Sequence, residues 1–374
     1  MGGYLRVLRA GPGATIQDDG RHGYQRYGVT PAGPMDWVAF RTANSALGNG
    51  RAAAVEVSVG GLEVICEGAP LALAFAGGDF AWRRDAVVLP QAARLLLEPG
   101  KTLAARAGNW GAFAYLAVKG GFETPVTMGS RATHTRSAMG GIGGRMLRAG
   151  DVLPAAASAE RPDGTSFEAT IDAPWLAREP DPFRVVPGPQ DDYFTRETLS
   201  AFYEGQFTLT PAADRMAYRF DGPDIAHAGG YDIVSDAIAL GAIQIAGDKK
   251  PLVLMADRQP TGGYPKLGHV ARADIGRLAQ MRPRETCSFR EVSVAEARAA
   301  LLQCEDAIAT TRQRLCPLRR ELASENLFEA NLIGGVVDPL DSERTGGEEE
   351  GTAKRSSRGS GRFNASREPQ RAGP

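Results

Sequence analysis

Short apolar runs that stop at glycine, proline or aspartate constrain the fold of this chain more than any other feature. The first third of the chain contains runs such as YLRVLRA (4–10), AAVEVSV (53–59), LALAFAG (71–77) and AFAYLAV (112–118). Short apolar runs bounded by turn residues are typical of β-strands. Because the chain also has 46 glycines and 24 prolines, which favour tight turns, we predict a mainly β protein with few helices.

Three segments have the pattern of helices. PMDWVAFRTANSALGN (34–49) places Asp36 near its start, where a carboxylate caps a helix well. TRETLSAFYEG (195–205) predicts a short helix. Residues 294–316 have helical periodicity that Pro317 should break.

The order of these patterns divides the chain into two β blocks. At about 100–200 residues per domain, the 374 residues predict two domains or one large domain. Residues 155–181 are rich in Ala, Pro and Asp, which indicates a linker, and further strand-like runs follow it. We therefore expect β domains at 4–180 and 181–293, a helical segment at 294–338, and a polar, disordered tail at 339–374.

Charge and cysteine content argue against several classes of protein. The 43 basic and 44 acidic residues balance, which gives no basis for binding nucleic acid or an anionic membrane. No apolar run approaches the about 20 residues that span a bilayer, and the N-terminus lacks a signal-peptide pattern. Four cysteines without CxxC spacing and four scattered histidines indicate neither a disulfide framework nor a metal site. We expect a reduced, cytoplasmic protein.

Nucleotide and biotin motifs are incomplete in this chain. PGKT (99–102) resembles the end of a phosphate-binding loop, but Leu95 stands where the motif needs glycine. GPGATI (11–16) lacks the third glycine of a dinucleotide fingerprint, and no Met-Lys-Met acceptor for biotin occurs. If ATP or biotin takes part in the function, we expect a partner chain to carry it.

Two stretches concentrate polar side chains among turn glycines. The first is TIQDDGRHGYQRYGVTPAGPMD (15–36), and the second is DRQPTGGYP (257–265), which follows the apolar run PLVLMA. Each has a structural interpretation, since Asp18 and Arg21 could pair to brace a loop and the second stretch could be a hairpin turn. Taken together, they favour a functional interpretation, in which the two turns converge to form one substrate-binding site.

Several further motifs carry a family resemblance. They include SRATHTRSAMGGIGGRMLRAGD (130–151), SDAIALGAIQIAGD (235–248) and LMADRQPTGGYPKLGHVARADIGRLAQMRPRE (254–285). With the first polar stretch, these make residues 4–338 resemble the KipA-like family. That family comprises the C subunit of 5-oxoprolinase, allophanate hydrolase subunit 2 and the carboxyltransferase domain of urea carboxylase. The resemblance implies that both β domains are cyclophilin-like barrels with a cleft between them.

The resemblance implies a substrate with an amide or urea-like group, and the chemistry of such a group suggests roles for the residues of the two polar stretches. A carboxylate base at Asp257 and a cationic clamp at Arg258 or Lys266 would serve proton removal beside a held carboxylate. Tyr264 offers an aromatic wall and a hydroxyl, so Asp257, Arg258 and Tyr264 are the predicted catalytic residues. The predicted substrate-binding residues are Gln17, Asp18, Arg21, Arg215, Gln259, Thr261, Gly262, Gly263 and Lys266.

The same residues also have structural interpretations. Asp214 and Arg215 could form an ion pair at a strand start, and Asp257 with Arg258 could fix a turn. Tyr264 could simply plug a barrel mouth, and His269 is treated as incidental.

Three hypotheses for function follow from the resemblance. The first is a subunit of a bacterial 5-oxoprolinase, which opens 5-oxoproline with ATP, paired with KipI-like and LamB/YcsF-like proteins as its B and A subunits. The second is the carboxyltransferase component of a urea- or guanidine-type carboxylase, which would use carboxybiotin supplied with its partners. The third is a non-catalytic KipA-type regulatory module that binds a KipI-like partner.

Overall fold

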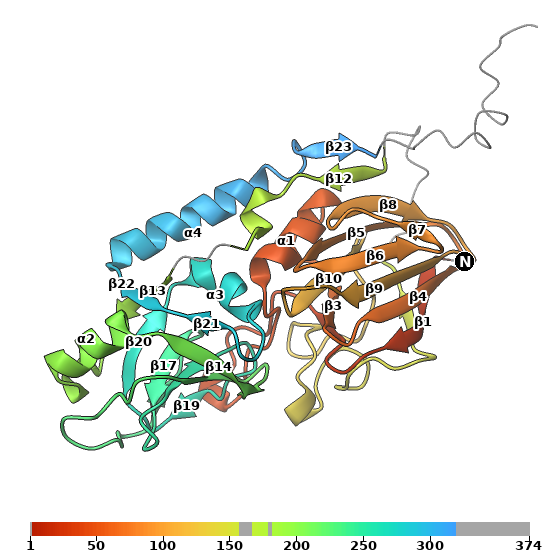
Figure 1. Ribbon diagram of the computed structural model, residues 1–374. Helices are drawn as coiled ribbons and strands as arrows, with labels where there is room; N and C mark the ends of the chain where they lie inside the picture. The colour runs from red at the N-terminus through yellow and green to blue at the C-terminus, as the bar shows by residue number, and fades with distance from the viewer. Residues whose placement is uncertain (1, 157–166, 179–181, 319–374) are drawn as a thin grey trace, which may run out of the picture. The chain divides into compact units, whose positions relative to one another are not determined.

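The computed structural model describes residues 2–156, 167–178 and 182–318, and strands dominate these ranges (Figure 1). Their four α-helices are α1 (Trp37–Ala46), α2 (Arg196–Glu204), α3 (Arg272–Ala279) and α4 (Val294–Ala309). This confirms the predicted mainly β fold with few helices.

The first β block consists of two sheets. The six-stranded sheet has the order β11 (Val152–Pro154), β1 (Tyr4–Ala10), β4 (Leu62–Glu67), β9 (Thr102–Ala107), β6 (Phe80–Arg84), β7 (Val87–Val88). The seven-stranded sheet has the order β2 (Thr15–Gln17), β3 (Ala54–Ser58), β10 (Phe113–Val118), β5 (Leu71–Gly77), β8 (Ala93–Leu97), β12 (Ala169–Ile171), β23 (Leu315–Pro317). Both contribute to one core, in which the rings of Phe75 and Trp82 stack with centroids 4.2 Å apart.

Strand β5 shows why these residues fold in this way. Its sequence LALAFAG is buried along its whole length. Leu71, Leu73 and Phe75 face the core between the two sheets, whereas Ala72, Ala74 and Ala76 belong to the cluster that includes α1. Because side chains alternate across a strand, this sequence places large residues on one face and small ones on the other, so α1 can pack closely.

The second β block is a single eight-stranded sheet. Its order is β21 (Thr286–Cys287), β14 (Phe207–Ala213), β15 (Ala217–Asp221), β18 (Pro251–Leu254), β17 (Ala242–Ile245), β20 (Lys266–Val270), β13 (Phe183–Pro187), β22 (Phe289–Glu291). The two edge strands, β21 and β22, are separated only by Ser288. The sheet must therefore curl until its edges meet, which makes it barrel-like. Phe202 of α2 packs inside against Phe207 and Phe289.

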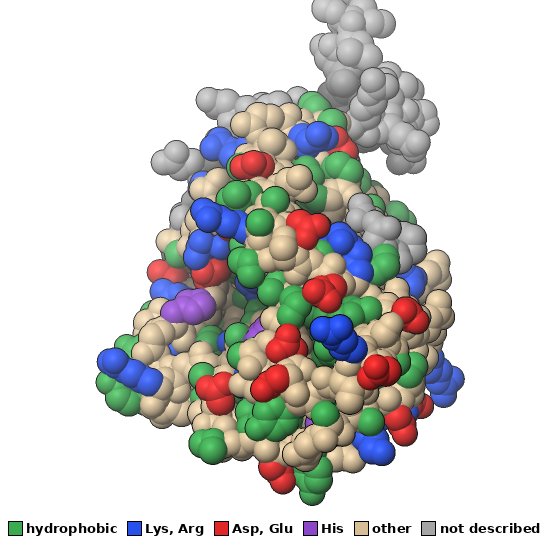
Figure 2. All heavy atoms as spheres, turned by 90° about the vertical axis from the view of Figure 1, so that its left-hand side faces the viewer, with side chains coloured by type: hydrophobic (Ala, Val, Ile, Leu, Met, Phe, Trp, Pro, Cys, Tyr) green, Lys and Arg blue, Asp and Glu red, His purple; other side chains and the backbone are tan. Residues whose placement is uncertain are grey.

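The face of the molecule on the side of the second block carries a mixed surface. Figure 2 shows acidic, basic and apolar side chains interspersed on this face. No single sign of charge dominates it, in keeping with the 43 basic and 44 acidic residues of the chain.

A helical layer joins the two blocks. Asp36 caps α1 by accepting hydrogen bonds from the backbone N–H groups of Val38 and Ala39, and its other oxygen accepts from Gln280, just after α3. A Cβ on Gly276 of α3 would lie 2.5 Å from the Asp36 carboxylate. Glycine at this position therefore allows α3 to approach α1, and the predicted cap at Asp36 is confirmed.

The region after the first block differs from its prediction. The composition of residues 155–181 predicts a linker, but Ala169–Ile171 form β12, which pairs with β8 and β23. The helix expected over 294–316 ends at Ala309, and Leu315–Pro317 return as β23. Pairing between segments far apart in the chain, which local periodicity does not encode, explains both differences. The remainder of the predicted helical segment and the tail at 339–374 lie outside the described residues.

The predicted domain boundaries at 180 and 293 stay predictions. Helix α3 also lacked a prediction from the sequence. No helix in the described ranges combines the length and apolar character needed to cross a bilayer.

Candidate functional site

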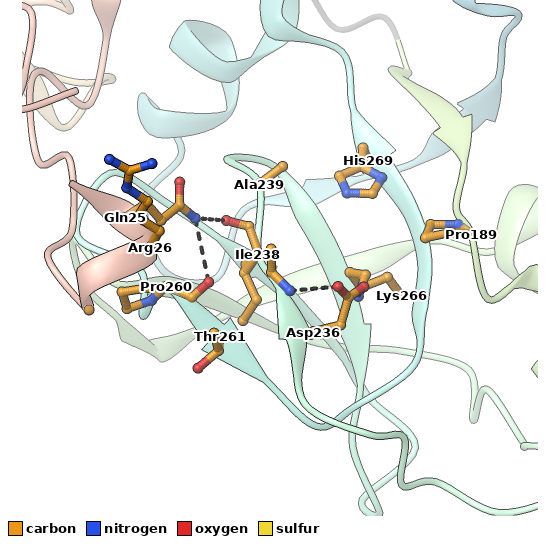
Figure 3. Close-up of a pocket in the computed structure, with 12 residues that line it drawn as sticks. Gln25, Arg26, Pro189, Asp236, Ile238, Ala239, Pro260, Thr261, Lys266 and His269 are labelled. Atoms are coloured by element: carbon orange, nitrogen blue, oxygen red, sulfur yellow. Dashed lines mark hydrogen bonds and ion pairs between the residues drawn. The ribbon is translucent and has the colours of Figure 1, made fainter. Parts of the chain in front are cut away.

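The two polar stretches lie together, as the sequence predicted. Thr30 donates a hydrogen bond from its hydroxyl to the Arg258 carbonyl over 2.7 Å. Gln25 donates from Nε2 to the carbonyl of Ile238 (2.7 Å) and more weakly to that of Pro260 (3.4 Å), as the dashed lines in Figure 3 show. The 15–36 loop of the first block therefore docks on turns of the second block.

A cavity of about 580 Å³ opens where this loop meets the second block (Figure 3). It lies beside a short two-stranded ribbon in which β16 (Asp236–Ala237) pairs with β19 (Thr261–Gly262). Its lining residues are Gln25, Arg26, Gly28, Pro189, Asp236, Ala237, Ile238, Ala239, Pro260, Thr261, Lys266 and His269. Of the predicted site residues, Thr261 and Lys266 contribute to this lining.

Lys266 supplies a buried positive charge to the cavity. Its side chain is 2% exposed, and Nζ donates to Asp236 Oδ2 over 2.6 Å. That hydrogen bond is the main reason why the pKa of Asp236 is lowered. Burial, followed by the charge of Lys266, lowers the pKa of His269. The cavity wall thus combines an ammonium group, a carboxylate and an imidazole whose neutral form is favoured.

A bulge in β20 places Lys266 and His269 on the same cavity. Gly268 pairs with Ile243, but the next pair joins Lys266 to Gln244, so Leu267 is an extra residue. Residues three positions apart on a regular strand point to opposite faces, and a bulge changes that alternation. The inserted residue therefore lets both side chains line one pocket.

Asp257 does not line the cavity but belongs to a buried ion-pair network. Arg215 binds both carboxylate oxygens of Asp257 at 2.9 Å, donates to the Gly33 carbonyl at 2.7 Å, and pairs with Glu56. Burial opposes the charge on Arg215, but the attraction of Asp257 and then Glu56 outweighs it and raises the pKa of Arg215. Glu56 also accepts from Tyr115 at 2.7 Å. The network joins the two β blocks through charge.

Arg215 does not form the ion pair with Asp214 that the sequence offered as a structural alternative. Asp214 pairs instead with Arg136 at 3.1 Å. Arg258 is also buried, and its guanidinium donates to the backbone carbonyls of Ile238 (3.1 Å) and Met255 (3.4 Å). Burial lowers the pKa of Arg258 to about 10. Arg258 thus fixes the backbone at Ile238 and is not among the residues that line the cavity.

The predicted residues of the first stretch brace a neighbouring segment. Gln17 donates to the Thr133 carbonyl at 3.1 Å, and Arg21 donates to the Thr127 and Ala132 carbonyls at 3.0 and 2.8 Å. Asp18 accepts from the Ser130 hydroxyl and the Arg131 N–H, both at 2.6 Å. Asp18 and Arg21 therefore both hold the 127–133 segment, rather than pairing as the structural alternative supposed.

The remaining residues of the second stretch shape the ribbon. A Cβ on Gly262 would lie 2.6 Å from Ile238 Cδ1 and 2.8 Å from Gln244 Nε2. Gly263 accepts a hydrogen bond from the Ile233 N–H at 2.8 Å. Gln259 is half-buried, and Tyr264 is 37% exposed with its carbonyl 3.4 Å from Gln244 Nε2. The catalytic and binding roles of these residues stay predictions.

Sequence reasoning missed two cavity residues and underrated a third. Asp236 stands in a stretch that was assigned no site, and His269 was treated as incidental, because the bulge that places it beside Lys266 has no sequence signal. Gln25 was noticed in the polar stretch but given no role. Among the residues that the structure describes, no group of three or more His, Cys, Asp or Glu is placed to hold a metal ion.

The chain is similar to known proteins in both sequence and structure. It is 33% identical to the C subunit of 5-oxoprolinase from Escherichia coli (78% of this chain, 93% of that protein) and 35% identical to that of Haemophilus influenzae, with the same coverage. The crystal structure of Kluyveromyces lactis urea amidolyase superposes with a TM-score of 0.76 at 26% identity, over 85% of this chain and 21% of that one.

The family match spans most of both β blocks. Residues 27–291 match the carboxyltransferase domain, subdomain A and B, a range that includes the ribbon, the Arg215 network and every cavity-lining residue except Gln25 and Arg26. The chain therefore belongs to the family of carboxyltransferase domains, subdomains A and B, whose KipA-like members include the C subunit of 5-oxoprolinase.

Proposed function

We propose that this chain is a subunit of a 5-oxoprolinase complex, which hydrolyses 5-oxoproline to glutamate with ATP. One observation carries the proposal. The two relatives named as the C subunit of 5-oxoprolinase are covered over 93% of their length, whereas the urea amidolyase is covered over only 21%. The chain thus matches these C subunits along nearly their whole length, at 33% and 35% identity.

Partner subunits are part of the proposal. The relatives that are named as the C subunit of 5-oxoprolinase support the presence of partner subunits. We propose that these partners are KipI-like and LamB/YcsF-like and that ATP is bound with them. Tyr27, Val234 and Tyr264 are 66%, 92% and 37% exposed, and each lies within two residues of one that lines the cavity. Contiguous apolar patches mark interaction sites; we propose that these three side chains contribute to one, where a seated partner would exclude water from the cavity.

The chemistry assigns simple tasks to this chain. ATP would phosphorylate the lactam oxygen, water would then break the C–N bond, and the products would be glutamate, ADP and phosphate. Such a reaction depends on positioning and on stabilising negative charge. In the cavity, Lys266 supplies positive charge, while Thr261 and His269 supply hydrogen-bonding groups. Both Asp257 oxygens are bound by Arg215, so a role as base would require that carboxylate to act from within the ion pair.

A carboxyltransferase component of a urea- or guanidine-type carboxylase is the second candidate. The family description and the TM-score of 0.76 to urea amidolyase favour it. In that reaction an N–H nucleophile loses a proton and takes the carboxyl group from carboxybiotin. Asp257 would act as base and Lys266 would hold the carboxylate.

One assay distinguishes the two. The chain is purified with the proteins encoded beside its gene, and ATP hydrolysis is measured with 5-oxoproline and separately with urea. Turnover that requires 5-oxoproline supports the first function, and turnover that requires urea and a biotin-carboxylase partner replaces it with the second.

Substitution tests the third hypothesis, a non-catalytic KipA-type module. Asp257→Asn and Tyr264→Phe are each introduced into the reconstituted complex. Unchanged turnover with unchanged partner binding would show that the loop is not catalytic and would favour the regulatory module. A fall in turnover with partner binding retained would support a role for the loop in the reaction.

A further inference from the structure

Lys266 and its partner Asp236 differ sharply in exposure. The Lys266 side chain is 2% exposed, whereas that of Asp236 is 50% exposed. An ammonium group this far from water needs a carboxylate or a similar acceptor. Here the acceptor is the half-exposed carboxylate of Asp236, which lies beside Lys266 in Figure 3.

The backbone of the ribbon that carries Asp236 is held at Ile238, whose carbonyl accepts hydrogen bonds from Gln25 and Arg258, but the Asp236 side chain is half exposed. Strand β16 pairs with β19 through two residue pairs, Asp236 with Gly262 and Ala237 with Thr261, and both residues of β16 are exposed. Exposed side chains change rotamer readily, so the carboxylate can turn away from Lys266 without opening the ribbon. The buried lysine is therefore fixed, while its carboxylate partner can be exchanged.

A second polar group lies next to Lys266 on the sheet. Gln244 pairs directly with Lys266 in the β17–β20 ladder and is fully buried. Its Oε1 atom has no hydrogen-bond partner among the described residues, although buried polar atoms normally have one. Lys266 lines the cavity, whereas Gln244 does not, so Lys266 is the group that an entering acid meets first. 5-Oxoproline carries a carboxylate beside its lactam N–H and urea carries none, so an ammonium anchor favours 5-oxoproline.

We propose that Lys266 anchors the carboxylate of the substrate, and that Asp236 occupies this place in the free protein and leaves when an anionic substrate enters. The inference rests on the proposed function for the identity of that substrate. It makes Lys266 and Asp236 the pair that selects an acidic lactam over a neutral amide. If Asp236 merely braces the ribbon, its removal would affect acidic and neutral ligands alike.

Calorimetric titration of the full-length protein tests this exchange. The probes are two matched pairs of an acid and a neutral analogue: 5-oxoproline with 2-pyrrolidinone, and cyclopentanecarboxylate with cyclopentanecarboxamide. The variants are Asp236→Asn and Lys266→Met. Asp172→Asn is the control, because Asp172 is a similarly exposed carboxylate, paired with Arg314 at 2.7 Å outside the cavity.

Removing the competing carboxylate should tighten acid binding. We expect Asp236→Asn to lower the Kd of both acids by about tenfold and Lys266→Met to raise them by at least tenfold, as for a charge-assisted hydrogen bond. The neutral analogues should change by less than twofold, and Asp172→Asn should change nothing. Equal effects on acids and neutral analogues, weaker acid binding by Asp236→Asn, or no acid binding to either the wild type or Asp236→Asn would overturn the inference. Asp236→Asn keeps the test valid even if Lys266→Met does not fold.

The same variants separate this inference from the proposed function. If the complex hydrolyses 5-oxoproline and Lys266→Met leaves its KM unchanged, the carboxylate anchor is wrong and the function stands. If Lys266 controls acid binding but the complex never hydrolyses 5-oxoproline, the anchor stands and the function is wrong.

Discussion

Replacing Arg215 by methionine should strongly destabilise the protein. Arg215 is the cation between Glu56 and Asp257, whose side chains are 0% and 6% exposed, and it is itself only 14% exposed. Methionine replaces the aliphatic stem of arginine but carries no guanidinium, so two buried carboxylates would lose their partner. Breaking a buried ion pair from one side costs about 3–5 kcal/mol.

Arg219, which lies four residues further along the chain in β15, provides the matched control. It pairs with Asp248, and the two side chains are 46% and 40% exposed. Surface ion pairs contribute about 0–1 kcal/mol, so Arg219→Met should change the free energy of unfolding by no more than that. The comparison isolates burial, because both substitutions remove an arginine that pairs with acidic side chains.

Equilibrium unfolding in urea measures the difference. A shift in the midpoint at constant slope reports a change in stability, and Arg215→Met should show several times the shift of Arg219→Met. Adding Asp257→Asn to Arg215→Met should cost less than the sum of the single changes, since the two residues interact directly. If Arg215→Met is as mild as Arg219→Met, the network does not hold the two β blocks together.

Three further predictions concern the ribbon, the helical layer and the histidines. Gly262→Ala should raise the KM for 5-oxoproline in the complex, because its Cβ would meet Ile238 and Gln244 at 2.6 and 2.8 Å. Gly229→Ala, with open space around it, should not, and equal KM values would refute the reasoning. Gln280→Ala should lower stability by about 1–3 kcal/mol for each buried group left unpaired, since Gln280 bonds Asp36, Ala112 and Phe113. A thermal melt no lower than that of the exposed Gln303→Ala would contradict this. Burial lowers the pKa of both His134 and His269 below the about 6.5 of the unfolded chain. The unfolded state therefore binds more protons as the pH falls through about 6.5, so stability should fall there. His134→Gln with His269→Gln should flatten that decline in Tm between about pH 7 and pH 5, and an unchanged slope would show that other groups cause it.

Local sequence patterns predicted the elements whose structure depends only on residues close together in the chain. The run LALAFAG became β5 because its alternation of large and small residues suits two packed faces, and Asp36 capped α1 because a cap needs only the residues that follow it. The pairing of β12 with β23 joins Thr170 to Cys316, and nothing within either short segment announces the other. Such long-range pairings explain why a linker and an extended helix were predicted where strands exist.

The site shows the same limit in its side chains. Arg215 was considered beside its neighbour Asp214, but the fold brings it to Asp257, 42 positions away, and to Glu56, 159 positions away. Lys266 and His269 line one cavity only because of a bulge at Leu267. Neither arrangement is local, so neither could be derived from spacing along the chain.

A dense run of polar residues in a glycine-rich loop has a physical cause other than catalysis. The 15–36 loop leaves one sheet and docks on another, so its backbone cannot satisfy all of its hydrogen bonds within a single ladder. Its side chains then supply bonds to the segments that it meets: Gln17, Arg21 and Thr30 donate to backbone carbonyls of those segments. Lys266 differs, because its buried charge faces a cavity and meets a carboxylate that remains half exposed. We infer that Lys266 binds a ligand because solvent can reach its partner, whereas Gln17, Arg21 and Thr30 brace backbone carbonyls, and this difference depends on the fold rather than on the residue type.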